Sequence, residues 1–211
     1  MVVDRSIMVS VVEGKSTMLK ETTKDKILAH GAQIIHQKGF KNTGIQEILY
    51  NAGVPKGSFY FYFKSKEDFG LELIDYYFNF FASMIESHLN GPEVSPLKRL
   101  QSFFEKFRSI CEQQGCKGGC PIGNLTQEIG GLSDAFQHKL RHALNKMKAG
   151  IAECLDLAQQ EQEIDPALDV SETADFILNS WEGALLRMKA ESNTAPLILF
   201  EKMVFDRVLK Q

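Results

Sequence analysis

Three of the four cysteines lie within ten residues of one another, in the glycine-rich stretch from Cys111 to Cys120. Lys117 stands between Cys116 and Cys120, and Pro121 opens a predicted short helix. A positive neighbour and a helix N-terminus both stabilise the thiolate, which is the reactive form of cysteine. We therefore predict that Cys116 or Cys120, with Cys111 as a candidate third participant, senses oxidants or electrophiles by a covalent change that loosens DNA binding. A second interpretation is that Cys120 is a small buried residue and the other two have no chemical role.

A metal site is a further alternative for the same cysteines. His138 and His142 lie one helical turn apart on a predicted helix and can supply two more ligands. However, the spacings of the cysteines, C-x₄-C and C-x₃-C, are not those of a typical zinc site. The sequence also lacks a phosphate-binding glycine motif, a nucleophile–base pair and paired carboxylates. We therefore predict no metal, no cofactor and no enzyme, and keep a thiol- or metal-dependent redox enzyme as the alternative class.

A second chemical pattern, from Thr43 to Asp68, reads as two short helices and the start of a third. Thr43 can cap the first helix, with Gln46 three residues later as its capping-box partner. Gly53 follows the last apolar turn, and Pro55 can begin the next helix. The chain thus turns within about three residues, which is the spacing of a helix-turn-helix.

The second short helix, Lys56 to Lys64, is the predicted reading element. Phe59 and Phe63 lie one turn apart and can anchor it to a core. Amines, hydroxyls and a bare glycine at a helix N-terminus suit contacts with phosphates and base edges. A buried strand over Phe59–Phe63 is the alternative, because aromatic residues favour strands. The side chains left outside the core are those of Lys56, Ser58, Tyr60, Phe61 and Lys64, beside the bare Gly57.

At these residues the sequence resembles the TetR family of bacterial transcriptional repressors. The resemblance runs from Thr23 to Phe69, and the block from Gly53 to Glu67 is highly specific. In that family this helix enters the major groove. The resemblance implies DNA contacts from Thr43, Lys56, Ser58, Tyr60 and Tyr62, and a phosphate contact from Lys64. Phe61 departs from the family pattern, which often has a polar residue there, and leaves an apolar contact.

The charge distribution agrees with a DNA-binding N-terminal part. The whole chain of 211 residues has a formal net charge of −3. From Lys15 to Lys66, however, nine lysines stand against three acidic residues, so the remainder is acidic. A basic head on an acidic body fits a DNA reader that has a separate function elsewhere, because phosphate neutralisation supplies most of the sequence-independent affinity.

We predict an all-α fold with three parts. Residues 1–20 are expected to be a disordered arm, 21–67 a three-helix helix-turn-helix domain, and 68–211 a helical ligand-binding and dimerisation domain joined to it by a long helix. The apolar stretch Ile7–Val12 is too short for a membrane span or a secretory signal, so the protein is expected in the cytoplasm. Predicted helices cover 23–38, 65–89, 97–111, 121–129, 133–162, 170–190 and 195–209.

The predicted body carries candidate ligand and dimer residues. An aromatic face on 97–111 is more often core, but the resemblance implies a cavity lined by Phe103, Phe104, Phe107 and Trp181. The run Gly-Cys-Pro-Ile-Gly-Asn-Leu resembles a subset of these regulators that includes electrophile-responsive ones. The resemblance also implies that the last two helices form a four-helix bundle with a second copy. Its candidate residues are Ile177, Trp181, Ala184, Leu185, Leu197, Phe200 and Val204.

The sequence therefore predicts a homodimeric repressor of a palindromic double-stranded DNA operator. A dimer follows from function as well, because one short helix reads too few bases for specific binding. A small-molecule or electrophile inducer is expected to release the DNA by favouring a second conformation of the body. A DNA-binding protein without an inducer is the remaining alternative.

Overall fold

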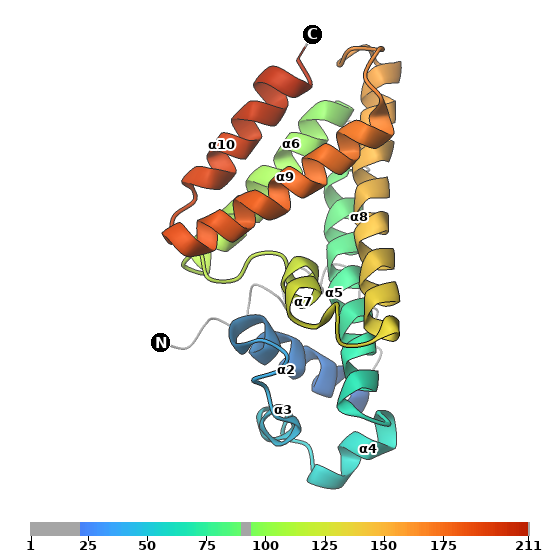
Figure 1. Cartoon of the computed structure of the whole chain (residues 1–211), viewed down its shortest axis with the longest axis vertical. Coiled ribbons are helices and arrows are strands. Elements are labelled where there is room, and N and C mark those ends of the chain that lie inside the picture. The colour runs from blue at the N-terminus through green and yellow to red at the C-terminus, as the bar shows by residue number, and fades with distance from the viewer. Residues whose placement is uncertain (1–21, 90–93, 211) are drawn as a thin grey trace. The chain divides into compact units, whose positions relative to one another are not determined.

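The computed structural model describes residues 22–89 and 94–210, and every regular element in these ranges is helical. The all-α prediction is confirmed (Figure 1). The described residues form two compact units, one of residues 22–81 and 121–143 and the other of residues 82–89, 94–120 and 144–210. The predicted arm, 1–20, lies outside the described residues. In the described ranges no helix is long and apolar enough to cross a membrane.

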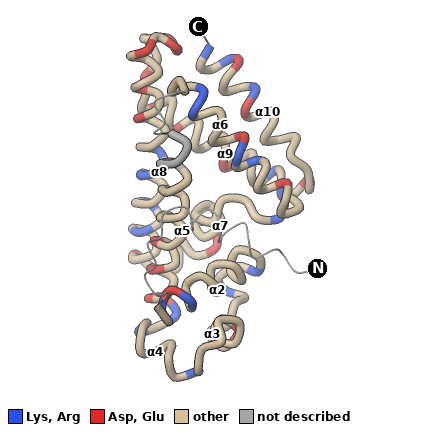
Figure 2. The backbone as a smooth tube through the Cα atoms, turned by 180° about the vertical axis from the view of Figure 1, so that it is seen from behind, with Lys and Arg blue, Asp and Glu red and all other residues tan. Residues whose placement is uncertain are grey.

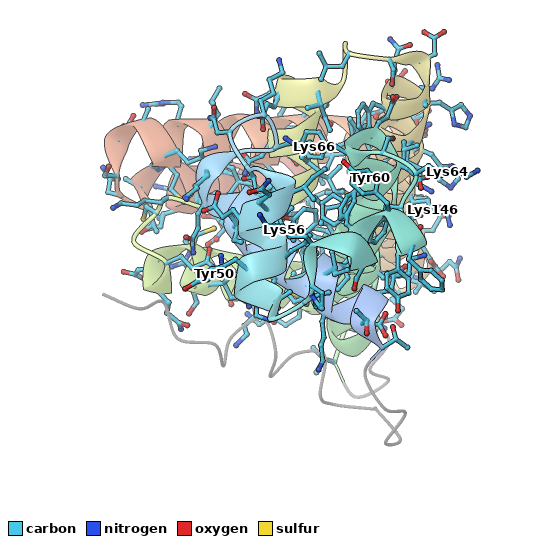
Figure 3. The ribbon with its side chains drawn as sticks, turned by 90° about the horizontal axis from the view of Figure 1, so that it is seen from below. Tyr50, Lys56, Tyr60, Lys64, Lys66 and Lys146 are labelled. Carbon is cyan, nitrogen blue, oxygen red and sulfur yellow. The ribbon has the colours of Figure 1, made fainter. Side chains whose placement is uncertain are left out.

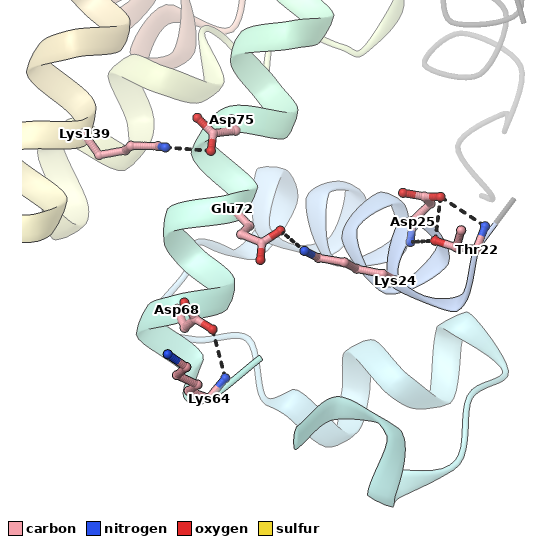
Figure 4. Close-up of polar contacts among 8 residues, drawn as sticks. All are labelled: Thr22, Lys24, Asp25, Lys64, Asp68, Glu72, Asp75 and Lys139. Atoms are coloured by element: carbon pink, nitrogen blue, oxygen red, sulfur yellow. Dashed lines mark hydrogen bonds and ion pairs between the residues drawn. The ribbon is translucent and has the colours of Figure 1, made fainter. Parts of the chain in front are cut away.

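The first unit begins with the helix-turn-helix. Helix α2 spans Thr23–Lys38 and starts with a capping box between Thr22 and Asp25 (Figure 4). Helix α3 spans Ile45–Ala52 and ends at Gly53, which adopts the left-handed conformation at φ 65°. Thr43 does not cap α3 as predicted. Gly44 occupies the N-cap position without a side-chain hydrogen bond.

The second short helix forms as predicted but is shorter and irregular. A 3₁₀ turn, Lys56–Ser58, leads into helix α4, Phe59–Tyr62, and Phe63 is already extended at φ −132°. The strand alternative for Phe59–Phe63 is therefore wrong. The rings of Phe59, Phe63 and Phe69 pack within 5.1–5.8 Å between centroids and are almost fully buried. This cluster fixes α4 on the helix that follows.

That following helix, α5, spans Lys66–Leu89, as the sequence predicts. The Ser65 hydroxyl accepts a hydrogen bond from the Asp68 N–H at 3.0 Å. The Asp68 carboxylate in turn accepts from the Lys64 N–H at 2.9 Å (Figure 4). The backbone leaving α4 is thus held by the first turn of α5.

Helix α5 also binds α2 closely. The Tyr77 hydroxyl donates to the Ala32 carbonyl at 2.5 Å, and burial raises the pKa of this phenol. A Cβ on Gly31 would lie 2.5 Å from the Phe69 ring, so only glycine permits this approach. An ion pair between Lys24 and Glu72 at 2.5 Å adds a surface contact (Figure 4).

Helix α7, Pro121–Ile129, and the first part of helix α8, Asp134–Gln160, complete the first unit. Phe136 packs edge-on against Phe40 at 5.8 Å. Lys139 pairs with Asp75 of α5 at 2.6 Å (Figure 4). The head therefore includes residues that are distant in sequence.

The second unit contains helices α6, Pro96–Gln113; α9, Val170–Glu191; and α10, Ala195–Met203. A π-helical turn, Val204–Val208, interrupts the helix predicted for 195–209. Arg108 of α6 pairs with Glu201 of α10 at 2.8 Å. The Leu97 N–H at the start of α6 donates to Glu163 at 2.9 Å.

Candidate DNA-binding surface and thiol site

The exposed side of the helix-turn-helix holds most of the predicted DNA contacts. Tyr60 is 68% exposed and Phe61 82% exposed, whereas Phe59 behind them is fully buried. Figure 3 labels the side chains of Lys56, Tyr60 and Lys64. Lys56, Gly57 and Lys64 are also exposed, and Ser58 and Tyr62 are half-buried. The structure thus places seven of the eight predicted contact residues at or near the surface of one short segment.

Thr43 is the exception among these eight residues. Its side chain is only 1% exposed, and its hydroxyl donates to the Gly39 carbonyl at 2.7 Å. A buried hydroxyl that is already engaged with the backbone has no reach to a phosphate or a base edge. The prediction of Thr43 as a DNA contact is therefore wrong. Its role is to hold the turn between α2 and α3.

Tyr50 is a surface residue that the sequence reasoning missed. It lies in the last turn of α3 and is 86% exposed (Figure 3). Its neighbours Ile48 and Leu49 are buried, so the helical period of that apolar face would have predicted an outward Tyr50. Between Ile48 and Phe63 the one charged residue is Lys56, which is positive, and Figure 2 shows the scarcity of acidic residues there. The face that carries α4 can therefore approach phosphates without like-charge repulsion.

Glu128 of α7 binds the backbone of the helix-turn-helix at the turn after α2. One carboxylate oxygen accepts from the Phe40 N–H at 2.7 Å and the other from the Lys41 N–H at 2.6 Å. We call this pair of contacts the Glu128 clamp. Gly39 has a φ of 85°, and a Cβ there would lie 2.9 Å from the Glu128 carboxylate. The clamp therefore requires glycine at 39.

Lys66 supports the same turn from the start of α5. Its amine donates to the Phe40 carbonyl at 2.7 Å and lies 4.7 Å from the centre of the Phe40 ring. Partial burial lowers the pKa of Lys66, while the charge of Glu128 opposes that change. Lys66 is thus engaged within the protein and positions the turn.

All four cysteines are buried free thiols. Burial raises the pKa of Cys111 to about 12 and that of Cys154 to about 11. The Cys154 thiol donates to the Pro96 carbonyl at 3.0 Å. Cys116 is a non-glycine residue with a φ of 59°, in a turn where its N–H donates to the Cys111 carbonyl at 2.8 Å. Cys111 and Cys154 therefore remain neutral near pH 7 and are poor nucleophiles.

Cys120 differs from Cys111 and Cys154 because its thiol forms a hydrogen bond with a carboxyl group. It is 2% exposed and donates a hydrogen bond to the carboxyl group of Glu182 in the middle of α9. Burial raises the pKa of Glu182 to about 7, and the hydrogen bond from Cys120 and the charge of Lys189 oppose that increase. The sequence reasoning did not identify Glu182, because the two residues are distant in sequence and no local pattern links them.

The four predicted ligand residues do come together. Trp181 lies 4.8 Å from Phe107, 5.8 Å from Phe104 and 6.4 Å from Phe103, measured between ring centres. Phe200 of α10 joins them at 5.0 Å from Phe104. The rings are nearly fully buried and pack on one another, so in this structure they form the core of the second unit.

The seven predicted dimer residues are all buried within the protomer, at 9% exposure or less. That part of the prediction has to be revised, since side chains buried in one protomer offer little surface to another. The exposed apolar side chains of α9 and α10 lie on the other faces of the same helices. They are Phe176, Leu186, Ile198, Leu199 and Met203.

Among the side chains that the structure describes, in residues 22–84 and 94–210, there is no group of three or more potential metal ligands. His138 and His142 therefore do not join the cysteines in a metal site.

An exposed short helix on an aromatic anchor, preceded by a tight turn and a positive charge, defines a DNA-binding protein of the helix-turn-helix class.

Residues 27–73 match the family model for bacterial regulatory proteins of the tetR family, and residues 96–204 match the tetracyclin repressor-like C-terminal domain. The chain is 33% identical over 192 residues to the transcriptional repressor DhaR of Mycobacterium sp. (strain GP1), covering 91% of this chain and 95% of that protein. It is 36% identical over 184 residues to the transcriptional regulator AcuR of Cereibacter sphaeroides, covering 84% of each.

The crystal structure of the reduced form of NemR from Escherichia coli is also similar. It has a TM-score of 0.81 and 26% identity, and the match covers 87% of this chain and 95% of that one. The protein belongs to the TetR family of bacterial transcriptional regulators. It is a regulator of transcription rather than an enzyme, and the redox-enzyme alternative is not favoured.

Proposed function

We propose that the protein is a homodimeric cytoplasmic repressor of a palindromic operator, released when an electrophilic small molecule modifies Cys120. The observation that carries the sensing step is the hydrogen bond between Cys120 and the half-buried Glu182. The Cys120 thiol has a carboxyl group as its hydrogen-bond partner, whereas the Cys111 thiol does not. A thiol in that position can become a nucleophile without becoming a free thiolate first.

The route from Cys120 to the DNA-binding surface follows the chain. Pro121, the next residue, is the first residue of α7, and Glu128 near the end of α7 forms the clamp on Phe40 and Lys41. A group added to Cys120 needs space in a close-packed interior, so the start of α7 has to move. A rigid helix of nine residues carries that displacement to the clamp. The inducer then favours a conformation whose two heads no longer match the operator half-sites.

Binding to DNA and its release are tested in one titration. The labelled DNA comes from the region upstream of the gene for this protein, and fluorescence anisotropy is recorded at two salt concentrations with and without N-ethylmaleimide. We expect salt-sensitive, sequence-dependent binding that N-ethylmaleimide abolishes. The Cys120→Ser variant should bind DNA equally well and keep its complex in the reagent, whereas Cys116→Ser should respond like the unsubstituted protein. Release that persists in Cys120→Ser would transfer sensing to another part of the body, with the aromatic cluster around Trp181 as the first candidate.

The dimer interface is proposed to consist of the exposed apolar residues of α9 and α10. Leu199 is 53% exposed, and an aspartate there would put an unpaired charge into an apolar contact. We expect Leu199→Asp to be monomeric at micromolar concentration, as measured by light scattering after size exclusion. Leu132→Asp is the matched control, because Leu132 is 55% exposed but belongs to the first unit. A dimeric Leu199→Asp protein would exclude this face as the interface.

A further inference from the structure

The carboxyl group of Glu182 lies where burial disfavours its charged form. Glu182 is half-buried in the second unit, next in sequence to the core residue Trp181, and its Oε1 atom is inaccessible to solvent. The carboxyl group accepts a hydrogen bond from the Cys120 thiol. Its Oε1 atom is buried and has no hydrogen-bond partner among the residues that the structure describes. Buried polar atoms are nearly always paired, so an unpaired carboxyl oxygen beside a thiol is more expected of a reactive site than of a structural one.

The surroundings of Glu182 suit proton transfer near neutral pH. Burial raises the pKa of the carboxyl to about 7, and the groups that oppose the increase are the Cys120 thiol and the amine of Lys189. Near pH 7 both protonation states of Glu182 are therefore populated. An acid with a pKa close to the ambient pH is the most effective proton acceptor and donor, because neither state is scarce.

The Cys111 thiol has no carboxyl group among the groups that influence its pKa. Burial raises the pKa of Cys111 to about 12, and the neighbouring thiol of Cys116 also acts to raise it. The N–H of Gly119 favours the charged form of Cys111 but does not accept a proton. A thiol paired with a carboxyl group is thus present at Cys120 and not at Cys111.

We propose that Glu182 is the proton acceptor for the Cys120 thiol when its sulfur adds to an α,β-unsaturated carbonyl compound. The inference rests on the proposed sensing function and names its reaction. The Sγ atom forms a bond to the β-carbon while the Sγ–H proton moves to the Glu182 carboxylate. The carbon–carbon double bond becomes an enolate, which then takes that proton at the α-carbon. The product is a saturated thioether, the carboxylate is regenerated, and no oxidant or reductant is consumed.

The same arrangement favours uncharged electrophiles. The ionised Glu182 repels an anion at short range, and the repulsion is strong in a poorly hydrated site. The unpaired Oε1 can accept a hydrogen bond from a donor on the entering molecule, or donate one to its carbonyl oxygen when protonated. A neutral unsaturated aldehyde, ketone or imide fits these conditions better than an unsaturated carboxylate does.

The test is the pH dependence of Cys120 alkylation in the intact full-length protein. N-ethylmaleimide serves as the probe, and peptide-resolved mass spectrometry gives the rate at Cys120 between pH 5.5 and 9. We expect the rate to rise as Glu182 loses its proton near pH 7 and then to level off. In Glu182→Gln, which keeps the shape but accepts no proton, that step should vanish and the rate at pH 7 should fall at least about tenfold. Glu172→Gln, an exposed change in the first turn of the same helix, is the matched control and should follow the unsubstituted profile.

Each result either supports or overturns the role of Glu182 as the proton acceptor for Cys120. If the unsubstituted protein shows no levelling near pH 7, the proposal is overturned without reference to any variant. It is also overturned if Glu182→Gln keeps the step or reacts faster, since the carboxyl would then only suppress the thiolate. Operator titrations on the same alkylated samples test the sensing function separately. Alkylation with the expected profile but without DNA release would remove Cys120 as the sensor and leave the proton transfer intact.

Discussion

Replacing Lys56 or Tyr60 with alanine is expected to weaken operator binding by about 2–6 kcal/mol while the dimer persists. A base or phosphate contact is worth about 1–3 kcal/mol, and a two-fold symmetric dimer loses each contact twice. Tyr60 is exposed and Lys56 precedes the buried anchor Phe59, so neither side chain is needed for the core. Anisotropy titrations at several salt concentrations measure the loss.

The salt dependence of operator binding distinguishes a phosphate contact by Lys56 from a base contact by Tyr60. Loss of Lys56 should reduce the slope of log affinity against log salt, because a phosphate contact releases a counterion. Loss of Tyr60 should leave that slope unchanged and reduce discrimination between sequences. Tyr60→Phe distinguishes the hydroxyl from the ring. Lys106→Ala is the control, since Lys106 is exposed on α6 in the second unit. Undiminished binding by both alanine variants would refute the placement of the recognition helix.

The Glu128→Ala substitution is expected to have the second large effect. It removes the acceptor for the Phe40 and Lys41 N–H groups at once. Hydrogen bonds to a charged group contribute about 1.5–3 kcal/mol each, so we expect a loss of about 2–4 kcal/mol in the unfolding free energy, as part of the site is exposed. Denaturant unfolding measures this loss, and operator titration should show weaker binding because the turn before α3 is no longer held.

Two further variants, one at Glu128 itself and one at its neighbour Gln127, test whether the clamp accounts for the loss of stability. Glu128→Gln keeps one acceptor oxygen and presents an NH₂ group to the other N–H, so its unfolding free energy should lie between those of Glu128→Ala and the unsubstituted protein. Gln127→Ala changes the exposed neighbour on α7 and should change the stability by less than about 0.5 kcal/mol. If Glu128→Ala unfolds like Gln127→Ala, the clamp contributes nothing and cannot carry a signal from Cys120.

The helices could be predicted well because local signals determine their ends. The helix predicted from Thr23 to Lys38 is α2 to the residue, and Ser65, Ser133 and Pro121 mark the starts of α5, α8 and α7. Capping and proline effects act within one turn, so they can be read from a short stretch. The exposure of Tyr60 and Phe61 followed from the same helical period that buries Phe59 and Phe63.

The errors concern residues whose role depends on distant parts of the chain. Thr43 looks like a helix cap in sequence, but the Gly39 carbonyl is its actual partner. Ile177 and Leu197 are apolar enough for an interface, yet they pack inside the protomer, and periodicity alone cannot tell one apolar face of a helix from another when both exist. The tertiary fold brings together the pairs Cys120–Glu182 and Phe40–Glu128, and no local sequence pattern predicts these contacts.

The near-complete burial of Cys120 has a consequence for how quickly the protein can respond. A thiol that is 2% exposed reacts only during the brief openings that admit a reagent, so the observed rate is the chemical rate multiplied by the open fraction. Each 1.4 kcal/mol of opening free energy slows the response about tenfold. A sensor built in this way integrates exposure over time. A short pulse of electrophile modifies few dimers and leaves the genes silent, while a sustained dose accumulates adducts until most operators are free.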